Sequence, residues 1–521
     1  MRNLPDIRRR DVLKGAGAVI LSTGIGLPAT AKNFANQDVL RLSVSQAVAN
    51  LNPLLARVKS EYLVAECLYS GLTRLSSDMS SVPDLTESWT STDDLTVWTF
   101  KLRPNLVFHD GTRLTSADVV ATFRAILDAA TGSPGRRNVG PIVDIMARDD
   151  RTVVFTLSSP YADLAIALAY PNAKIIPGRF ASQGLARLNA TAIGTGPFRL
   201  VQYEGERLIV VERNPTYHHP PRPLLNRVEI VVYPDQSAER SALMSGDTDM
   251  MISVAATEFQ ELKEIPNVDA LRTPSGKFCN IIMANDRKPF DDARVRQALA
   301  LTVDRNAMVE FVAEGYGMPG NDTPLNSAYH RHYESLPFKP RRIQRARELL
   351  SEAGYPDGLR LELIASDRPY QRIPLAVALR AMAKPAGFDI EIRTMTHATY
   401  LAQVWKKGPF YVGVYNGQAT ADAIFSLLYT SDAPWNETRW NNHDFDANVK
   451  AAKSTTNDLR RNKLYSRAQK LMYDEVPSII PVFLDLLAAK RDYVKGYNLH
   501  PRGAVFNLDQ IWIDKLNIGG T

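Results

Sequence analysis

The sequence predicts an α/β protein built from several structural units. Short segments with the two-residue alternation of strands are interleaved with segments of helical periodicity. A length of 521 residues allows roughly three units, at about 100–200 residues per domain. The chain is 45% hydrophobic and 23% charged, which is typical of a globular protein and excludes a disordered chain or a membrane channel.

The individual elements follow from local patterns. Short apolar or alternating runs predict strands at 39–48, 95–102, 151–157, 227–233, 278–283 and 360–364. Helical periodicity predicts helices at 61–69, after the capping pattern 115–118, and at 294–302, 343–353 and 373–386. Asp291 is expected to cap the helix that follows it. Gly111 and Gly354 are expected at positions of positive φ, which glycine adopts without strain.

The first 31 residues have the order of an export signal. Three arginines, Arg8 to Arg10, precede an uncharged stretch, Gly15–Ala31, that ends in an Ala-Thr-Ala sequence. This order is typical of a twin-arginine signal. The alternative is a basic amphipathic helix kept at the start of a cytosolic protein. The export interpretation places the protein in the periplasm.

Charge and cysteine content exclude two further classes. The formal net charge is +6, and it falls to +3 when the first 31 residues are removed, so a nucleic-acid partner is not expected. Cys67 and Cys279 lie too far apart in sequence to form a CxxC motif, and both are interpreted as buried apolar residues.

Motifs of enzymes and of metal sites are weak. The sequence contains no GxSxG, HExxH or P-loop pattern. His218-His219 and the pair His330 and His332 have spacings that suit a metal, but we interpret them as solvated surface residues. Adjacent carboxylates such as Asp93-Asp94 are interpreted as turns. We therefore expect no metal, no cofactor and no catalytic residues.

Five segments together resemble a known family. Residues 107–119 contain Phe-His-Asp-Gly-Thr followed by Leu-Thr-Ser-Ala-Asp-Val, 194–198 read Gly-Thr-Gly-Pro-Phe, and 245–249 read Ser-Gly-Asp-Thr-Asp. Residues 289–305 begin Pro-Phe-Asp-Asp-Ala-Arg-Val-Arg-Gln-Ala-Leu, and 346–355 read Ala-Arg-Glu-Leu-Leu-Ser-Glu-Ala-Gly-Tyr. In this order they resemble the extracellular solute-binding proteins of the peptide/nickel type (family 5, oligopeptide/dipeptide-binding-like).

The resemblance implies a bilobal periplasmic-binding-protein fold with a hinge, of type II and cluster C-like, with an extra subdomain. The units it implies are the export signal 1–31, lobe I in three parts at 32–78, 193–285 and 488–521, the extra subdomain 79–192, and lobe II at 286–487.

The resemblance also implies ligand residues near position 368. Segment 366–370 is similar to the Gln-Arg-Pro-Tyr segment of dipeptide-binding members, in which the arginine pairs with the ligand carboxylate. Arg368 is the arginine at this position, its planar guanidinium suits a carboxylate, and Tyr370 accompanies it. The alternative is a surface arginine before a proline turn.

A second segment departs from the family pattern. Where dipeptide-binding members have an aspartate for the ligand amine, residues 414–425 have Gln418, and Asp422 lies four residues later. A neutral amide cannot neutralise an ammonium group. This favours an anionic or amine-blocked ligand, such as an opine, an acylated peptide or a metal chelate.

Aromatic residues concentrate in the carboxy-terminal part of the chain. Trp405, Trp435 and Trp440 join Tyr370 and Tyr415 there, where they could form pocket walls or pack in the core. We expect Tyr415 to line the cleft, because it shares a loop with Gln418.

These observations predict a periplasmic substrate-binding protein of an ABC importer that binds a peptide-like or other carboxylate-bearing solute. It is expected to be a monomer, to perform no catalysis and to deliver its solute to membrane permease subunits. The alternatives are a secreted hydrolase and a periplasmic chaperone-like module. The sequence identifies neither the solute nor its affinity.

Overall fold

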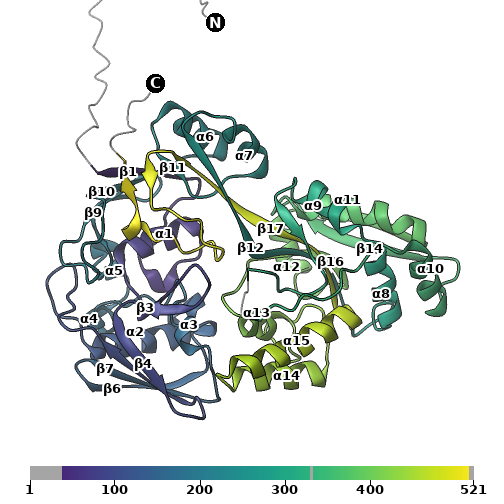
Figure 1. Cartoon of the computed structure of the whole chain (residues 1–521), viewed down its shortest axis with the longest axis horizontal. Helices are drawn as coiled ribbons and strands as arrows, with labels where there is room; N and C mark the ends of the chain where they lie inside the picture. The colour runs from purple at the N-terminus through teal and green to yellow at the C-terminus, as the bar shows by residue number, and fades with distance from the viewer. Residues whose placement is uncertain (1–37, 329–331, 515–521) are drawn as a thin grey trace, which may run out of the picture. The chain divides into compact units, whose positions relative to one another are not determined.

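One large mixed sheet runs through the computed structural model, which describes residues 38–328 and 332–514 (Figure 1). The sheet has eleven strands in the order β15-β14-β16-β12-β17-β11-β1-β10-β9-β8, and β13 pairs with β17. The described residues belong to the unit Asp38–Thr521. The predicted export signal and His330 lie outside the described residues.

The first half of the chain supplies one end of the large sheet and a smaller sheet. Its strands are β1 (Val39–Val44), β2 (Thr73–Leu75), β3 (Ser81–Pro83), β4 (Thr86–Ser91), β5 (Val97–Leu102), β6 (Ile142–Asp149), β7 (Thr152–Leu157), β8 (Phe198–Glu204), β9 (Leu208–Arg213), β10 (Arg227–Val232) and β11 (Met250–Met251). Its helices are α1 (Lys59–Leu68), α2 (Ser116–Leu127), α3 (Leu164–Ala167), α4 (Gly178–Gln183), α5 (Arg187–Thr191), α6 (Gln236–Ser245) and α7 (Ala256–Leu262). The smaller sheet has the order β4-β5-β7-β6.

The second half supplies the other end of the large sheet. Its strands are β12 (Val268–Met283), β13 (Gly317–Pro319), β14 (Leu359–Ser366), β15 (Phe388–Met395), β16 (Phe410–Tyr415), β17 (Ser478–Arg491), β18 (Val494–Lys495) and β19 (Trp512–Ile513). Its helices are α8 (Ala293–Leu301), α9 (Arg305–Val312), α10 (Ile343–Glu352), α11 (Arg372–Ala383), α12 (His397–Gln403), α13 (Ala421–Leu428), α14 (His443–Lys453) and α15 (Asp458–Glu475).

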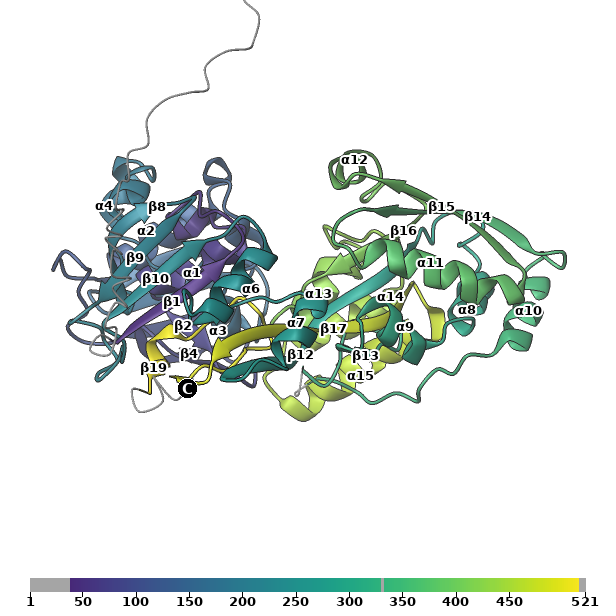
Figure 2. The same cartoon turned by 90° about the horizontal axis from the view of Figure 1, so that it is seen from above.

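Two long antiparallel strands connect the two ends. Strands β12 and β17 pair from Val268 opposite Arg491 to Ile282 opposite Ser478, and a register shift falls between Thr273 and Lys277. Figures 1 and 2 both show them passing from the elements around β1 to those around β16. The chain thus crosses between the two ends twice.

The hydrophobic core is divided in the same way. One cluster joins residues of β1, α1, the small sheet and the segment 488–513. Two other clusters lie within residues 278–484. One packs α8 to α11 against one side of β12 and β17, and the other contains residues of α13 to α15. The large clusters at the two ends share no residue and are linked by β12 and β17, which makes the chain bilobal.

Most predicted elements are present, with some corrections. The prediction of Asp291 as a helix cap is wrong, because the Asp292 side chain accepts the Arg294 N–H at 2.8 Å. The predicted strand 278–283 is only the end of the 16-residue strand β12. The capping box at Thr115 and Asp118 is confirmed, as are positive φ angles at Gly111 and Gly354. Cys67 and Cys279 are fully buried, as expected.

Candidate functional site

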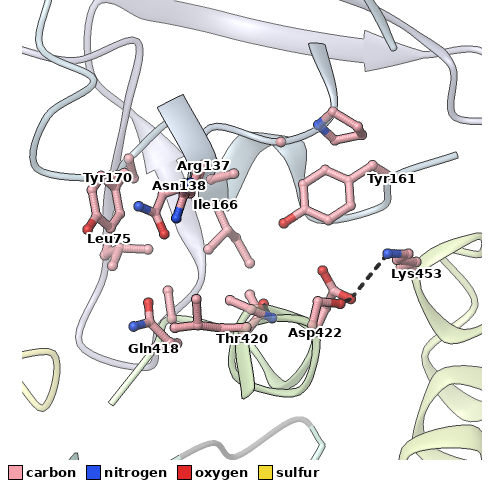
Figure 3. A pocket seen from close by; sticks show the side chains of 18 of the residues that line it. Leu75, Arg137, Asn138, Tyr161, Ile166, Tyr170, Gln418, Thr420, Asp422 and Lys453 are labelled. Atoms are coloured by element: carbon pink, nitrogen blue, oxygen red, sulfur yellow. Dashed lines mark hydrogen bonds and ion pairs between the residues drawn. The ribbon is translucent and has the colours of Figure 1, made fainter. Parts of the chain in front are cut away.

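Two adjacent cavities are lined by residues from both halves of the chain. The first, which we call the Tyr161 cavity, has a volume of about 470 Å³ and is lined by segments within 136–171 and 418–453 (Figure 3). The second, which we call the Lys59 cavity, has a volume of about 490 Å³. Four residues line both of them: Tyr170, Pro171, Gln418 and Arg502. The two cavities therefore adjoin around Gln418.

Local structure places Gln418 and its neighbours. Tyr415 ends β16, and Thr420 caps α13 by accepting the Ala423 N–H at 3.1 Å. A strand followed directly by a capped helix leaves only a short loop, and Gln418 lies in it. In Figure 3 the α13 ribbon carries Thr420 and Asp422 toward Ile166 and Tyr161 on the facing wall.

The Lys59 cavity has cationic walls. It is lined by Arg57 and Lys59 at the start of α1, by Lys277 on β12 and by Arg502, and no carboxylate lines it. Lys277 lies where the register of β12 and β17 shifts. No ion pair between any of these four side chains and a carboxylate occurs among the described residues. An anion bound in this cavity would face four cationic side chains and no carboxylate of the lining.

The two lysines that line this cavity both have lowered pKa values. The Lys59 ammonium donates to the Ile252 carbonyl at 2.7 Å. Burial, together with the nearby charge of Lys277, lowers the pKa of Lys59 to about 8, although Glu239 acts in the opposite direction. Burial also lowers the pKa of Lys277. Burial raises the pKa of Glu239 to about 7, so this carboxylate only partly compensates Lys59 at neutral pH.

The Tyr161 cavity contains Asp422, which already has partners. Lys453 approaches the Asp422 carboxylate at 3.9 Å, and the Ser426 hydroxyl donates to it at 2.8 Å. Burial raises the pKa of Asp422. Arg136 and Arg137 also line this cavity. The carboxylate is thus matched by its own lysine.

Tyr415 belongs to a polar and aromatic cluster at the wall of the Lys59 cavity. Its hydroxyl donates to the Glu437 carboxylate, and the Trp405 ring N–H donates to the Tyr415 oxygen at 3.3 Å. The Trp435 ring lies 6.3 Å from that of Tyr415 and also lines the cavity. Burial raises the pKa of Glu437 to about 7. Trp440 lies outside this cluster and packs on Phe445.

The structure does not bring Arg368 and Tyr370 to these cavities. Both side chains are exposed at the end of β14, and neither lines either cavity. The buried arginine of this segment is Arg372, which donates to the Ser366 hydroxyl at 2.6 Å and stacks over the Tyr400 ring at 4.1 Å. Of the five predicted ligand residues, only Tyr415, Gln418 and Asp422 line a cavity.

Lys59, Lys277 and Arg502 are not among the ligand residues predicted from the sequence. A signal existed only for Lys277, which directly precedes the apolar run Phe278 to Met283. A lysine next to a buried strand is unusual, because a buried ammonium normally needs a partner. Lys59 and Arg502 lie in ordinary polar contexts, and only the fold brings them to the cavity.

The interpretation of His218 and His219 as surface residues is wrong. Their side chains are 8% and 16% exposed, and both ring Nε2 atoms face the buried carboxylate of Asp84. His332 is also buried, and its Nδ1 lies 3.0 Å from the Asn462 side-chain oxygen.

Two lobes joined by two strands, with a cavity lined from both, define the class of bilobal binding proteins. The chain belongs to the bacterial extracellular solute-binding proteins, family 5, whose model matches residues 80–437. It is a solute-binding protein of the kind that serves ABC importers and delivers small solutes to their permeases. No finding favours the alternatives of a hydrolase or a chaperone-like module.

Individual relatives agree with this assignment. The chain is 28% identical over 500 residues to the glutathione-binding protein GsiB of Escherichia coli K12, covering 93% of this chain and 96% of the relative. The solved structure of AgaA from A. tumefacien R10 in complex with agropinic acid is 26% identical, with a TM-score of 0.76, covering 91% and 98%. The ABC transporter substrate-binding protein CtaP of Listeria monocytogenes matches the fold with a TM-score of 0.81 at 22% identity, covering 92% and 99%.

No helix among residues 38–328 and 332–514 has the length and apolar character that crossing a membrane requires.

Proposed function

We propose that this protein captures a small anionic, carboxylate-bearing solute in the periplasm and releases it unchanged to an ABC permease. The ligand occupies the Lys59 cavity and extends past Gln418 into the Tyr161 cavity. Tyr415, Gln418 and Asp422, three of the five ligand residues predicted from the sequence, line this space.

The observation that carries the proposal is the charge of the cavity walls. The two linings contain seven lysines and arginines, namely Arg57, Lys59, Arg136, Arg137, Lys277, Lys453 and Arg502, and one carboxylate, Asp422. The remainder of the chain is nearly neutral. A concentration of one charge sign in a cleft attracts ligands of the opposite sign and strengthens their binding.

A free peptide amine finds no counter-charge of its own there. Gln418 is neutral, and Asp422 is matched by Lys453 at 3.9 Å. Burying an unpaired ammonium is costly, so the walls select against a zwitterion and favour an acid whose amine is blocked or absent. The relative named for agropinic acid supplies the first acid to test, and glutathione, which keeps a free α-ammonium group, tests the selection against zwitterions.

We expect the two lobes to close on the ligand, because residues of both lobes line the Lys59 cavity. Lys59 and Arg502 belong to the part of the chain whose core contains β1, while Gln418 and Trp435 follow β16. A ligand that contacts residues of both lobes stabilises the closed form to the extent that it binds the closed form more tightly than the open form. Strands β12 and β17 are the connection about which the lobes would turn.

The boundaries and the location complete the proposal. We propose the boundaries that the resemblance implies: an export signal at 1–31, lobe I at 32–78, 193–285 and 488–521, an extra subdomain at 79–192 and lobe II at 286–487. A protein carrying such a signal acts in the periplasm.

Isothermal titration against a panel of acids, their amides and cationic analogues tests the proposal. We expect acids to bind and their neutral amides to bind at least tenfold more weakly. Mass spectrometry of ligands released from denatured protein should find an acid, and the solute should be recovered unchanged after incubation. Equal binding of acids and amides, or turnover of a ligand, would contradict the proposal.

A further inference from the structure

Asp84, His218 and His219 converge on one point outside both ligand cavities. The Asp84 Oδ1 atom lies 2.9 Å from the His218 Nε2 and 3.3 Å from the His219 Nε2. One ligand atom from each of the three lies within 4.8 Å of the others, and this is the single group of its kind among residues 38–328 and 332–514. We propose that these three side chains form a Zn²⁺ site.

The spacing of the donor atoms fits this ion. Tetrahedral Zn²⁺ holds nitrogen and oxygen ligands at about 2.0–2.2 Å, which separates neighbouring ligand atoms by about 3.3 Å. The two measured separations from Asp84 Oδ1 are close to that value. Two imidazoles and one carboxylate leave a fourth position for water, and a nitrogen-rich donor set suits zinc better than calcium or magnesium.

The ligands are held in place before an ion arrives. The second oxygen of Asp84 accepts the Gly71 N–H at 3.0 Å, which fixes the carboxylate plane. The Tyr217 ring makes edge contacts with His218 and His219, at 4.6 and 5.5 Å between ring centroids. Such outer contacts orient metal ligands and raise affinity. The 16% exposure of His219 provides the path of entry.

The rings present the right atoms for a metal. Both direct Nε2 toward the same carboxylate oxygen, and imidazole binds a metal through one ring nitrogen while the other carries the proton.

The nearby arginines do not neutralise the Asp84 carboxylate. The Arg74 guanidinium is paired with Asp509 at 3.1 Å, and Arg222 approaches the same carboxylate at 3.5 Å. Arg103 donates through its Nε to the backbone carbonyl of Asp84 at 2.7 Å. The Asp84 carboxylate itself therefore remains free of any arginine ion pair among the described residues.

Titration of ZnCl₂ into the chelator-treated full chain, purified without a histidine tag at pH 7.5, tests the site. We expect one equivalent to bind and the melting temperature to rise. His219→Ala should weaken zinc binding at least about tenfold, as even outer-shell changes cost 10–100-fold. His443→Ala, which replaces an exposed histidine, is the matched control and should bind zinc like the parent protein.

A second variant and a spectrum keep the result interpretable. Asp84→Asn should reduce zinc binding as well, and circular dichroism in EDTA establishes that both variants are folded. Co²⁺ bound to the parent protein should show the strong visible absorption of four-coordinate cobalt, and His219→Ala should lose it. Absence of stoichiometric zinc binding, or binding that both variants retain, would overturn the proposal and leave a purely hydrogen-bonded cluster.

Discussion

Two pairs of cationic side chains in this protein have opposite electrostatic settings. Arg305 and Lys339 both contact Asp322, at 2.7 and 2.8 Å, and the side chains of Arg305 and Asp322 are fully buried. Lys59 and Lys277 line a cavity that contains no carboxylate. A buried charge that the chain itself neutralises supports the fold, whereas charges left on a cavity wall are available to a ligand.

The Asp322 site shows the expected features of a structural ion cluster. Its second oxygen accepts the Ile480 N–H at 3.1 Å, and Arg305 also donates to the Gly320 and Ile480 carbonyls. The two cations hold the pKa of Asp322 below its usual value, against the effect of burial. These contacts connect α9, β17 and the segments that carry Asp322 and Lys339, all within one lobe.

The largest expected effect is on stability. Asp322→Asn leaves two buried cations without a counter-charge and should lower the free energy of unfolding by about 3–5 kcal/mol. Urea unfolding followed by circular dichroism measures this. Asp432→Asn, at an exposed position, is the control. A loss below 1 kcal/mol for Asp322→Asn would remove the distinction between the two pairs.

The next effect is on ligand affinity alone. Lys277→Met should weaken binding of the best acid by about 2–5 kcal/mol, as expected when one partner of a buried charge pair is removed. Stability should not fall, because the variant also removes a partly desolvated charge. Titration calorimetry and thermal melting measure the two quantities, and Lys463→Met, at an exposed position, serves as the control. A large loss of stability with unchanged affinity would make Lys277 structural.

Ligand affinity is expected to depend on pH through Lys59 and Glu239. Above neutrality Glu239, with a pKa of about 7, gains charge beside Lys59, and Lys59, with a pKa of about 8, then loses its own. Both changes reduce attraction for an anion, so affinity should fall as the pH rises from 7 to 9. Calorimetry at several pH values measures this.

Lys59→Arg separates the two contributions, because arginine stays charged throughout this range. In this variant the affinity should still fall near pH 7, where Glu239 gains charge, but it should not fall further above pH 8, where Lys59 loses its charge in the parent protein. A parent profile that is flat from pH 7 to 9 would exclude Lys59 from the binding of the anion.

The smallest effect is expected at Arg368. Its side chain is exposed and lines neither cavity, so Arg368→Ala should change affinity by less than about twofold. The same calorimetric titration tests this. A loss of tenfold or more would restore the pairing of Arg368 with a ligand carboxylate that the sequence resemblance implied.

Local patterns in the sequence were sufficient for much of the fold. The capping box at Thr115, the glycine stop at Gly354 and the alternation of β5 depend on neighbours in the chain, and the structure contains all three. Strand β17 was missed, because its continuous apolar run lacks the alternation of a half-exposed strand. Tyr415 and Gln418 could be placed together because Tyr415 ends β16 and Gln418 lies in the short loop that follows it.

The remaining features depend on contacts between distant residues. Lys59 and Lys277 are 218 positions apart, and Asp84 and His218 are 134 apart. Neither pair leaves a local pattern, because the energy of a charge or of a metal ligand depends on what surrounds it in space. Local and motif patterns in the sequence were sufficient for the family, for five of the helices and for six of the strands. Which cations line a cavity without a carboxylate, and which histidines face a carboxylate, depends on the spatial arrangement of distant segments.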